Sequence, residues 1–271
     1  MGLSVTTIGR GTDVRLSDVA CTLGRRDRPF PEVHERGWTI ALVRRGSFRY
    51  RSTKAKGAHV LRAGWLLFGT PEAEYECSHD HDGGDDCSSL FLPEGVLPDV
   101  SRASGVACEK LLAAAPALPP LPRAAALLER ARVRGGVDLD ELGYLVAESV
   151  VEHACGVPIA PVARHTTHVR RVHDALDRIE SRCREPLALA DLADAAGFSP
   201  FHFLRVFRSV TGTTPHQYLI GARLRLASKM LLDTKRSVTE IAYEVGFEDL
   251  SNFMRTFRRV IGSTPRDYRR A

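Results

Sequence analysis

Long hydrophobic runs are missing from this sequence of 271 residues. The richest apolar patch, 65–68, has the length of a strand, whereas a membrane span needs about 18 apolar residues in a row. The N-terminus also lacks the basic segment and the apolar stretch that together mark a secretory signal. We therefore expect a cytoplasmic protein that has no membrane partner.

Cysteine is scarce too, with six residues scattered along the chain. Without a secretory signal, so few cysteines indicate thiols that are free or bound to metal. The hydrophobic share of 44% and the charged share of 26% are those of an ordinary globular protein. The length allows two domains, each with a core of its own.

An excess of negative charge is absent from the last third of the chain. Residues 168–271 hold 18 Lys and Arg against 12 Asp and Glu, whereas residues 1–167 hold 20 against 21. The net charge of +5 therefore arises in the last third. Such a local basic excess is typical of a domain that binds nucleic acid.

Short apolar stretches punctuated by glycine and proline fill the first 98 residues. Stretches 38–46 and 47–51 indicate a β-hairpin broken at Gly46. Further short strands are expected at 58–61, 65–68 and 89–92. This spacing predicts a small barrel or sandwich.

Apolar residues take helical spacing after Pro98. Helices are expected at 109–115, 123–134 and 139–154. The segment 156–167 contains prolines and reads as an extended linker. The remainder of the chain is expected to be helical.

Two segments near the C-terminus repeat each other. Residues 192–198 (LADAAGF) return as 241–247 (IAYEVGF), and residues 203–208 (FLRVFR) return as 253–258 (FMRTFR). The offset grows from 49 to 50 between these pairs, so one residue is inserted in the second turn. We therefore expect one supersecondary unit to occur twice.

Each copy has the parts of a helix-turn-helix. A short helix, 189–196 or 238–245, carries a small alanine, and a glycine follows where a positive φ costs little. The second helix carries an apolar stripe, which is Phe203, Val206, Phe207 and Val210 in one copy and Phe253, Phe257 and Val260 in the other. Ser237 and Glu240 form a capping box, whereas Ala188 is a weaker start by about 1 kcal/mol.

The region from about residue 168 to Tyr268 resembles the DNA-binding domain of AraC/XylS-type transcription regulators. The match includes Ile241-Ala…Gly246-Phe247…Phe253…Arg255…Phe257-Arg258…Gly262…Thr264-Pro265…Tyr268. The resemblance implies an all-α domain at 168–271 whose two units are joined by a long helix, 215–233, with Thr214 as its N-cap. It also implies promoter DNA and RNA polymerase as partners, and association with the nucleoid when bound to DNA.

The N-terminal half resembles, more loosely, the cupin-like barrel with which such regulators sense a ligand. The resemblance rests on residues 30–76, with His34, Gly46, Gly64 and Pro71. It implies an α+β chain with a cupin-like sensor domain at 1–98 and a helical layer at 99–155. That layer is expected to hold a homodimer together, and simple packing of the helices against the barrel is the alternative.

Candidate DNA contacts lie on the outward faces of the second helices. These candidates are Phe201, Leu204, Arg205, Arg208, Leu250, Ser251, Met254, Arg255, Arg258 and Arg259, with His216 and Arg266 near helix N-termini. Arg205 and Arg255 are expected to pair with guanine, and Phe201 and Leu204 to touch thymine methyl groups. The other arginines and His216 are expected near phosphates. The alternative for each arginine is a solvated helix face.

One cluster of cysteine and histidine precedes an acidic stretch. Strand alternation over 77–81 would place Cys77, His79 and His81 on one face, and Gly83-Gly84 would return Cys87 beside them. Two thiolates and two imidazoles suit Zn²⁺ or another divalent transition metal. An acidic hairpin loop and a redox pair of Cys77 with Cys87 are the alternatives.

The sequence as a whole indicates a transcription activator that responds to a small-molecule or metal effector. A redox-responsive regulator, a DNA-binding protein without an effector and a metal-dependent cupin-type enzyme are the alternatives. The enzyme needs an open metal position and a nearby general base, and the sequence identifies neither. We therefore expect no enzymatic activity.

Overall fold

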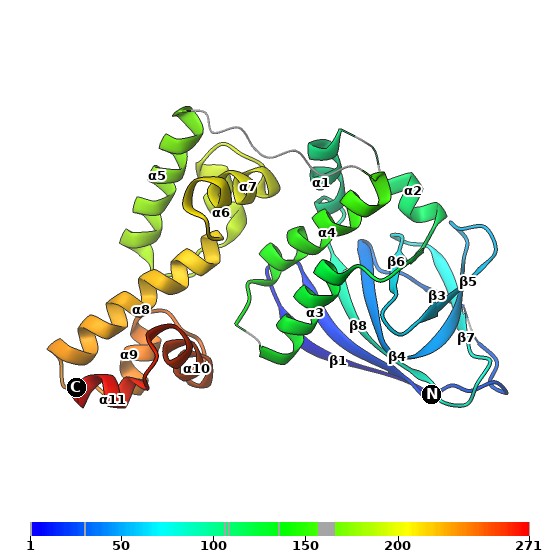
Figure 1. Cartoon of the computed structure of the whole chain (residues 1–271), viewed down its shortest axis with the longest axis horizontal. Coiled ribbons are helices and arrows are strands. Elements are labelled where there is room, and N and C mark those ends of the chain that lie inside the picture. Colours follow the sequence, from blue (N-terminus) through cyan, green and yellow to red (C-terminus); the bar gives the residue numbers. More distant parts are fainter. Residues whose placement is uncertain are drawn as a thin grey trace. The chain divides into compact units, whose positions relative to one another are not determined.

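Two separately packed units make up the chain, Met1–Ala160 and Pro161–Ala271 (Figure 1). The computed structural model describes residues 2–29, 31–105, 107, 109–134, 136–156 and 166–270. Most of the expected linker, residues 157–165, lies outside the described residues. Within the described part, no helix combines the length and the apolar character that crossing a bilayer requires.

The first unit is built on an antiparallel sheet that is not closed. Its strands are β1 (Leu3–Arg10), β2 (Arg15–Cys21), β3 (Glu32–Val33), β4 (Trp38–Ser52), β5 (Ala58–Arg62), β6 (Leu66–Gly69), β7 (Glu74–Ser78), β8 (Asp85–Leu92) and β9 (Ala117–Leu118). The main path runs β1-β2-β8-β4-β6-β9, which leaves β1 and β9 as edges. The strands β5 and β7 pair with the second part of β4, and β3 pairs with β7. These pairings therefore do not form a closed barrel.

The long strand β4 connects the two parts of the sheet. Its first part pairs with β6 and β8, and from Ser47 onward it pairs with β5 and β7. The expectation of a hairpin broken at Gly46 is therefore wrong. Gly46 has a φ of +78° inside the strand, and a Cβ there would lie 2.2 Å from the backbone oxygen of Gly84. The glycine permits a bulge and a close backbone approach instead of a turn.

Helices cover one face of the main sheet path (Figure 1). They are α1 (Val96–Ser104), α2 (Glu109–Ala114), α3 (Pro122–Arg134) and α4 (Leu139–Cys155). Three of them match the expected segments within one or two residues, whereas α1 was not expected. In α4, a Cβ added to Gly143 would lie 2.8 Å from Leu92 of β8, so helix and sheet approach closely there. The sheet side of this layer is apolar, with Leu16, Ile40, Leu90 and Leu92 at most 1% exposed.

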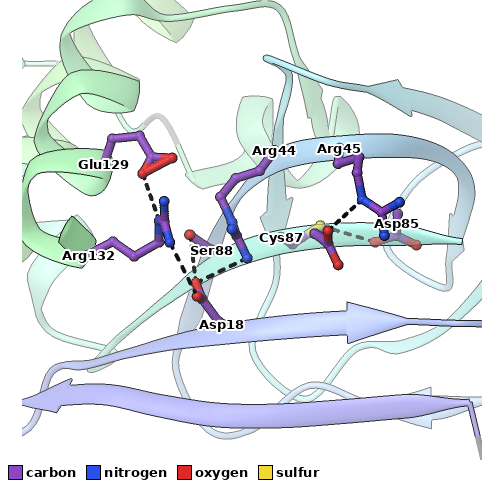
Figure 2. A network of polar contacts seen from close by, with 9 residues as sticks. Asp18, Arg44, Arg45, Asp85, Cys87, Ser88, Glu129 and Arg132 are labelled. Atoms are coloured by element: carbon purple, nitrogen blue, oxygen red, sulfur yellow. Dashed lines mark hydrogen bonds and ion pairs between the residues drawn. The ribbon is translucent and has the colours of Figure 1, made fainter.

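A polar network ties the sheet to α3 (Figure 2). The Asp18 carboxylate of β2 accepts a hydrogen bond of 3.0 Å from Ser88 Oγ of β8. It also forms ion pairs with Arg44 of β4 at 3.4 Å and with Arg132 of α3 at 3.8 Å. Arg132 in turn bonds Glu129 at 2.7 Å. One carboxylate thus joins three strands and a helix.

All regular secondary structure in the described residues of the second unit is helical. Its helices are α5 (Thr166–Arg182), α6 (Leu189–Ala195), α7 (Pro200–Thr211), α8 (Pro215–Asp233), α9 (Val238–Glu244), α10 (Leu250–Ile261) and α11 (Pro265–Arg270). The bounds of α8 are those expected, and the Thr214 side chain caps it by accepting from the Gln217 backbone N–H. Ser237 and Glu240 form the expected capping box, whereas α6 starts at Ala188 without a side-chain cap.

Candidate functional site

The turns of the two helix-turn-helix units have the same backbone geometry. Gly197 and Gly246 have φ values of +67° and +95° at the ends of the first helices. The residue after each glycine donates its N–H to the alanine five positions earlier, at 3.0 Å in both units. Those alanines, Ala193 and Ala242, are completely buried. Small residues and positive φ therefore permit the close turn in both copies, as expected.

Aromatic rings fix the orientation of each second helix. In the first unit the Phe203 and Phe207 centroids lie 5.6 Å apart, and the Phe207 and Tyr218 centroids 6.1 Å apart. In the second unit the Phe257 centroid lies 5.6 Å from that of Phe253 and 5.6 Å from that of Tyr268. These buried contacts decide which face of α7 and α10 turns away from the core.

On α10, the outward face is basic. Ser251, Arg255, Arg258 and Arg259 are exposed, and the helix begins at Asp249, which accepts from the backbone N–H of Ser251 at 3.2 Å. Leu250 and Met254 are only partly buried and pack against the core of this unit. Val260 is 55% exposed, so the expectation that the apolar stripe continues to it is wrong. The stripe ends with Phe257, although the helix continues to Ile261.

On α7, the expected outward face is different. Phe201 and Leu204 are 1% and 0% exposed, so the outward position expected for them is wrong. Leu204 corresponds in the repeat to Met254, which also packs on its core, because burying an apolar side chain is favourable. Arg205 and Arg208 are partly exposed, and the Arg205 guanidinium lies 5.4 Å from the Phe201 ring centroid. The accessible candidates of the first unit are therefore its two arginines.

Two arginines of the joining helix have structural contacts. Arg223 donates to the backbone oxygens of Cys183 at 2.7 Å and Glu185 at 2.9 Å, and burial lowers its pKa. Arg225 forms an ion pair with Glu180. Both contacts fasten α8 to the end of α5 or the segment after it. His216 is partly buried in the first turn of α8, and Arg266 is exposed in the first turn of α11.

The expected set of cysteines and histidines is not assembled. The strand β7 ends at Ser78, so alternation does not continue through His79 and His81. The His81 Nε2 instead lies 3.0 Å from Ser47 Oγ and 2.8 Å from Ser47 O. Of the four expected ligands, only His79 belongs to the group that could hold a metal among the described residues. The prediction of a site formed by Cys77, His79, His81 and Cys87 is therefore wrong.

That group consists of Cys21, His79 and Asp85, all buried. One potential ligand atom from each lies within 4.8 Å of the others. His79 Nε2 lies 2.6 Å from Asp85 Oδ1, and Cys87 Sγ donates to Asp85 Oδ2 at 3.3 Å. Sequence reasoning missed Cys21 and Asp85, because the strand around Cys21 was not predicted.

A cavity of about 520 Å³ lies on the face of the main sheet path that the helices do not cover. Alternate residues of β2 and β8 line it, namely Arg15, Ser17, Val19 and Cys21 with Asp85, Cys87, Ser89 and Phe91. Cys77 joins the other two thiols in its wall. Elsewhere in the wall, the ring centroid of His34 lies 4.2 Å from that of Tyr75. The cavity thus combines apolar surface with thiols, aromatic rings and charged groups.

Burial shifts the pKa of the three thiols and of His34 in the cavity wall. It raises the pKa of the Cys21, Cys77 and Cys87 thiols, and the nearby Asp85 carboxylate raises them further. Since attack by sulfur needs the thiolate, this disfavours the redox pair of Cys77 with Cys87. Burial lowers the pKa of His34 to about 4. The expectation that all thiols are free or metal-bound is wrong for Cys155, which is disulfide-bonded.

Comparison with known proteins places similarity in the second unit. A family model described as a helix-turn-helix domain matches residues 192–271. The transposon Tn10 TetD protein of Escherichia coli is 37% identical over 106 residues, which are 39% of this chain and 75% of TetD. The regulatory protein SoxS of Escherichia coli is 34% identical over 103 residues, 38% of this chain and 96% of SoxS. The solved DNA-binding domain of AdpA, in complex with a target DNA, is 33% identical over 37% of this chain and 90% of that one, with a TM-score of 0.36.

Proposed function

Because this chain belongs to the AraC/XylS family of DNA-binding transcription regulators, we propose that it is an activator whose first unit senses an effector. In this proposal the first unit is a cupin-like sensor domain, and the second unit binds promoter DNA. The effector changes how the DNA-binding units of two subunits are presented. RNA polymerase is the partner through which bound protein activates transcription.

The observation that carries the sensor role is the cavity of about 520 Å³ in the first unit. This volume is in the range of small-molecule sites, which combine apolar walls with a few polar groups. Arg15 and Glu35, which form an ion pair, line it together with Glu32, whose carboxylate accepts from Tyr75 Oη at 2.5 Å. A small organic molecule or a metal ion fits this chemistry.

In the proposed DNA complex, α7 and α10 enter the major groove. Arg255, exposed on α10, and Arg205, partly exposed on α7, contact guanine, and Arg258 and Arg259 contact phosphates. The 19 residues of α8 give a length of about 28 Å, close to the roughly 34 Å of one DNA turn. One chain can therefore place its two units in successive segments of the major groove.

The layer α1–α4 is the proposed contact between two copies. An apolar side chain on its outer surface supports this role, since Val133 of α3 is 65% exposed. The helices otherwise cover the sheet, so a dimer formed through them would couple the sheet to the arrangement of the subunits. Sedimentation of the full chain with Val133→Glu, against Val60→Glu on β5 as the matched exposed control, tests this placement.

The sensor role is tested by filling the cavity. Ser89 lines the cavity, so Ser89→Phe should block it, whereas Ser4→Phe on the exposed strand β1 should not. A reporter gene behind the bound promoter should lose its regulated response with Ser89→Phe and keep it with Ser4→Phe. DNA affinity of both variants, measured by titration, should stay within about twofold of the parent, since DNA contacts lie in the second unit. A regulated response that survives Ser89→Phe would refute the sensor role.

A further inference from the structure

The group Cys21, His79 and Asp85 is a preformed set of metal donors. Its thiol, imidazole and carboxylate lie within 4.8 Å of one another. Ligand atoms on one tetrahedral zinc ion are separated by about 3.5 Å. Side-chain movements of about an ångström would therefore place all three donor atoms on one ion. A single sulfur with nitrogen and oxygen donors suits zinc and the neighbouring divalent transition metals.

Strand pairing and one short connection bring these three residues together. Cys21 and Asp85 are directly paired across β2 and β8, so their side chains lie on the same face of the sheet. Both line the cavity. His79 comes from the connection between β7 and β8, which returns the chain to the start of β8. Two of the three donors are therefore held by a strand pair.

The buried His79 imidazole faces Asp85 through Nε2. The His79 side chain is 0% exposed, and its Nδ1 has no hydrogen-bond partner among the described residues. A carboxylate oxygen accepts, so Nε2 donates to Asp85 Oδ1 and Nδ1 keeps its lone pair. A metal ion shared with Asp85 would bind Nε2, because Nε2 faces that carboxylate and the lone pair of Nδ1 points away from it.

We propose that Cys21, His79 and Asp85 bind a divalent transition-metal ion of the zinc class, with an open coordination position facing the cavity. Binding releases the thiol proton of Cys21 to solvent and moves the His79 proton from Nε2 to Nδ1, so that the thiolate, Nε2 and the carboxylate become ligands. The thiol of Cys87, which donates to Asp85, orients that carboxylate from outside the metal's ligand set. This inference rests on the proposed sensor function in one respect, that the bound ion is the effector of the first unit.

The metal's effect on the fold would run through β8. Asp85 and Cys87 face the cavity, whereas Ser88 between Cys87 and Ser89 faces the other side and donates to Asp18. Asp18 forms the ion pair with Arg132 of α3. A metal that fixes the start of β8 would thus restrain a strand that is also linked to α3.

The test is direct metal titration of the full chain with Co²⁺, followed by competition with Zn²⁺. The bound Co²⁺ should show a charge-transfer absorption from one thiolate, and Zn²⁺ should abolish it at one equivalent. Cys21→Ser should weaken metal affinity by at least about 100-fold and Asp85→Asn by at least about tenfold. Cys77→Ser and His81→Asn are the matched controls, and both should bind within about threefold of the parent.

Variants that fail to fold do not decide the matter, so a second measurement uses the unaltered chain. Zn²⁺ should slow alkylation of Cys21 by iodoacetamide at least about tenfold, and that of Cys77 less than about twofold, as read by mass spectrometry. Absence of the thiolate absorption, equal protection of both cysteines, or loss of binding in Cys77→Ser with retention in Cys21→Ser would overturn the proposal. A chain that binds no metal yet loses regulation with Ser89→Phe would leave an organic effector as the ligand.

Discussion

Cys87 and Ser88 are neighbours on β8 whose side chains serve opposite faces of the sheet (Figure 2). Cys87 lines the cavity, and Ser88, completely buried, donates to the Asp18 carboxylate at 3.0 Å. The strand therefore belongs both to the wall of the cavity and to the attachment of α3. Residues that hold this strand should affect the stability of the whole first unit.

Replacing Asp18 tests that attachment. Asp18→Ala leaves Ser88 without its acceptor and deprives Arg44 and Arg132 of a partner, so it should lower the free energy of unfolding by about 1–3 kcal/mol. Asp86→Ala is the control, since it breaks only the exposed-side ion pair with Arg45 and should cost less than about 1 kcal/mol. Urea titration followed by tryptophan fluorescence reports the first unit, because both tryptophans lie in it. Equal losses in the two variants would contradict the role given to Asp18.

Acidification should destabilise the first unit through His34. Burial lowers its pKa to about 4, whereas an unfolded histidine titrates near 6.5. The unfolded state therefore binds more protons between these values, and stability falls as pH drops from 6.5 to 4, by about 3 kcal/mol at the lower limit.

His34→Gln removes this titration and can still bond the Tyr50 hydroxyl, which lies 2.9 Å from His34 Nε2. The other titrating groups remain, so their contributions cancel when the two proteins are compared. The difference in unfolding free energy between pH 7 and pH 4 should be smaller in the variant by about 3 kcal/mol. The same pH dependence in both proteins would show that His34 is not the responsible group.

The two helix-turn-helix units differ in the start of their first helices. Ser237 accepts from the Glu240 backbone N–H at 3.1 Å, whereas Ala188 offers no acceptor at the matching position. Ser237→Ala should therefore lower the stability of the second unit by about 1 kcal/mol, and Ala188→Ser should raise it by a similar amount. Thermal unfolding followed by circular dichroism at 222 nm measures both changes. A stabilising Ser237→Ala, or a destabilising Ala188→Ser, would contradict this assignment of the caps.

The second unit could be predicted from the sequence because its signals are local. Thr214 and Pro215 stand next to each other and set the start of α8, and Ser237 and Glu240 lie within one helical turn. The repeat then indicated which helices form each helix-turn-helix unit, without any knowledge of tertiary contacts. Phe201, Leu204 and Val260 differ from the expectation in their exposure.

The first unit could be predicted only in part because its contacts are distant in the sequence. A glycine with positive φ serves a turn or a bulge equally well, and the pairing of Gly46 with Asp85 in β8 makes it a bulge. Cys21 pairs with Asp85 across 64 residues, so no local spacing brings these donors together. The sequence identified His79 as a candidate ligand, but its neighbours Cys21 and Asp85 are set by the register of β2 against β8.

The roles proposed for Arg255 and Arg259 separate base reading from phosphate binding on α10. Arg255→Ala should cost about 1–3 kcal/mol on the specific site and relax the preference at one base pair. Arg259→Ala should weaken binding to all sequences alike and reduce the dependence of affinity on salt. Titration against operator variants with single-base changes measures both. Equal losses on every variant for Arg255→Ala would identify Arg255 as a phosphate contact.

The most direct test of the account is selection of bound sequences from random double-stranded DNA by the full chain. Two helix-turn-helix units joined by α8 should enrich two short motifs on each site, with centres about 10–10.5 base pairs apart. The motifs should differ from each other, since α7 and α10 present different side chains. Enrichment of a single motif, or none above a control without protein, would contradict the proposal that both units read DNA.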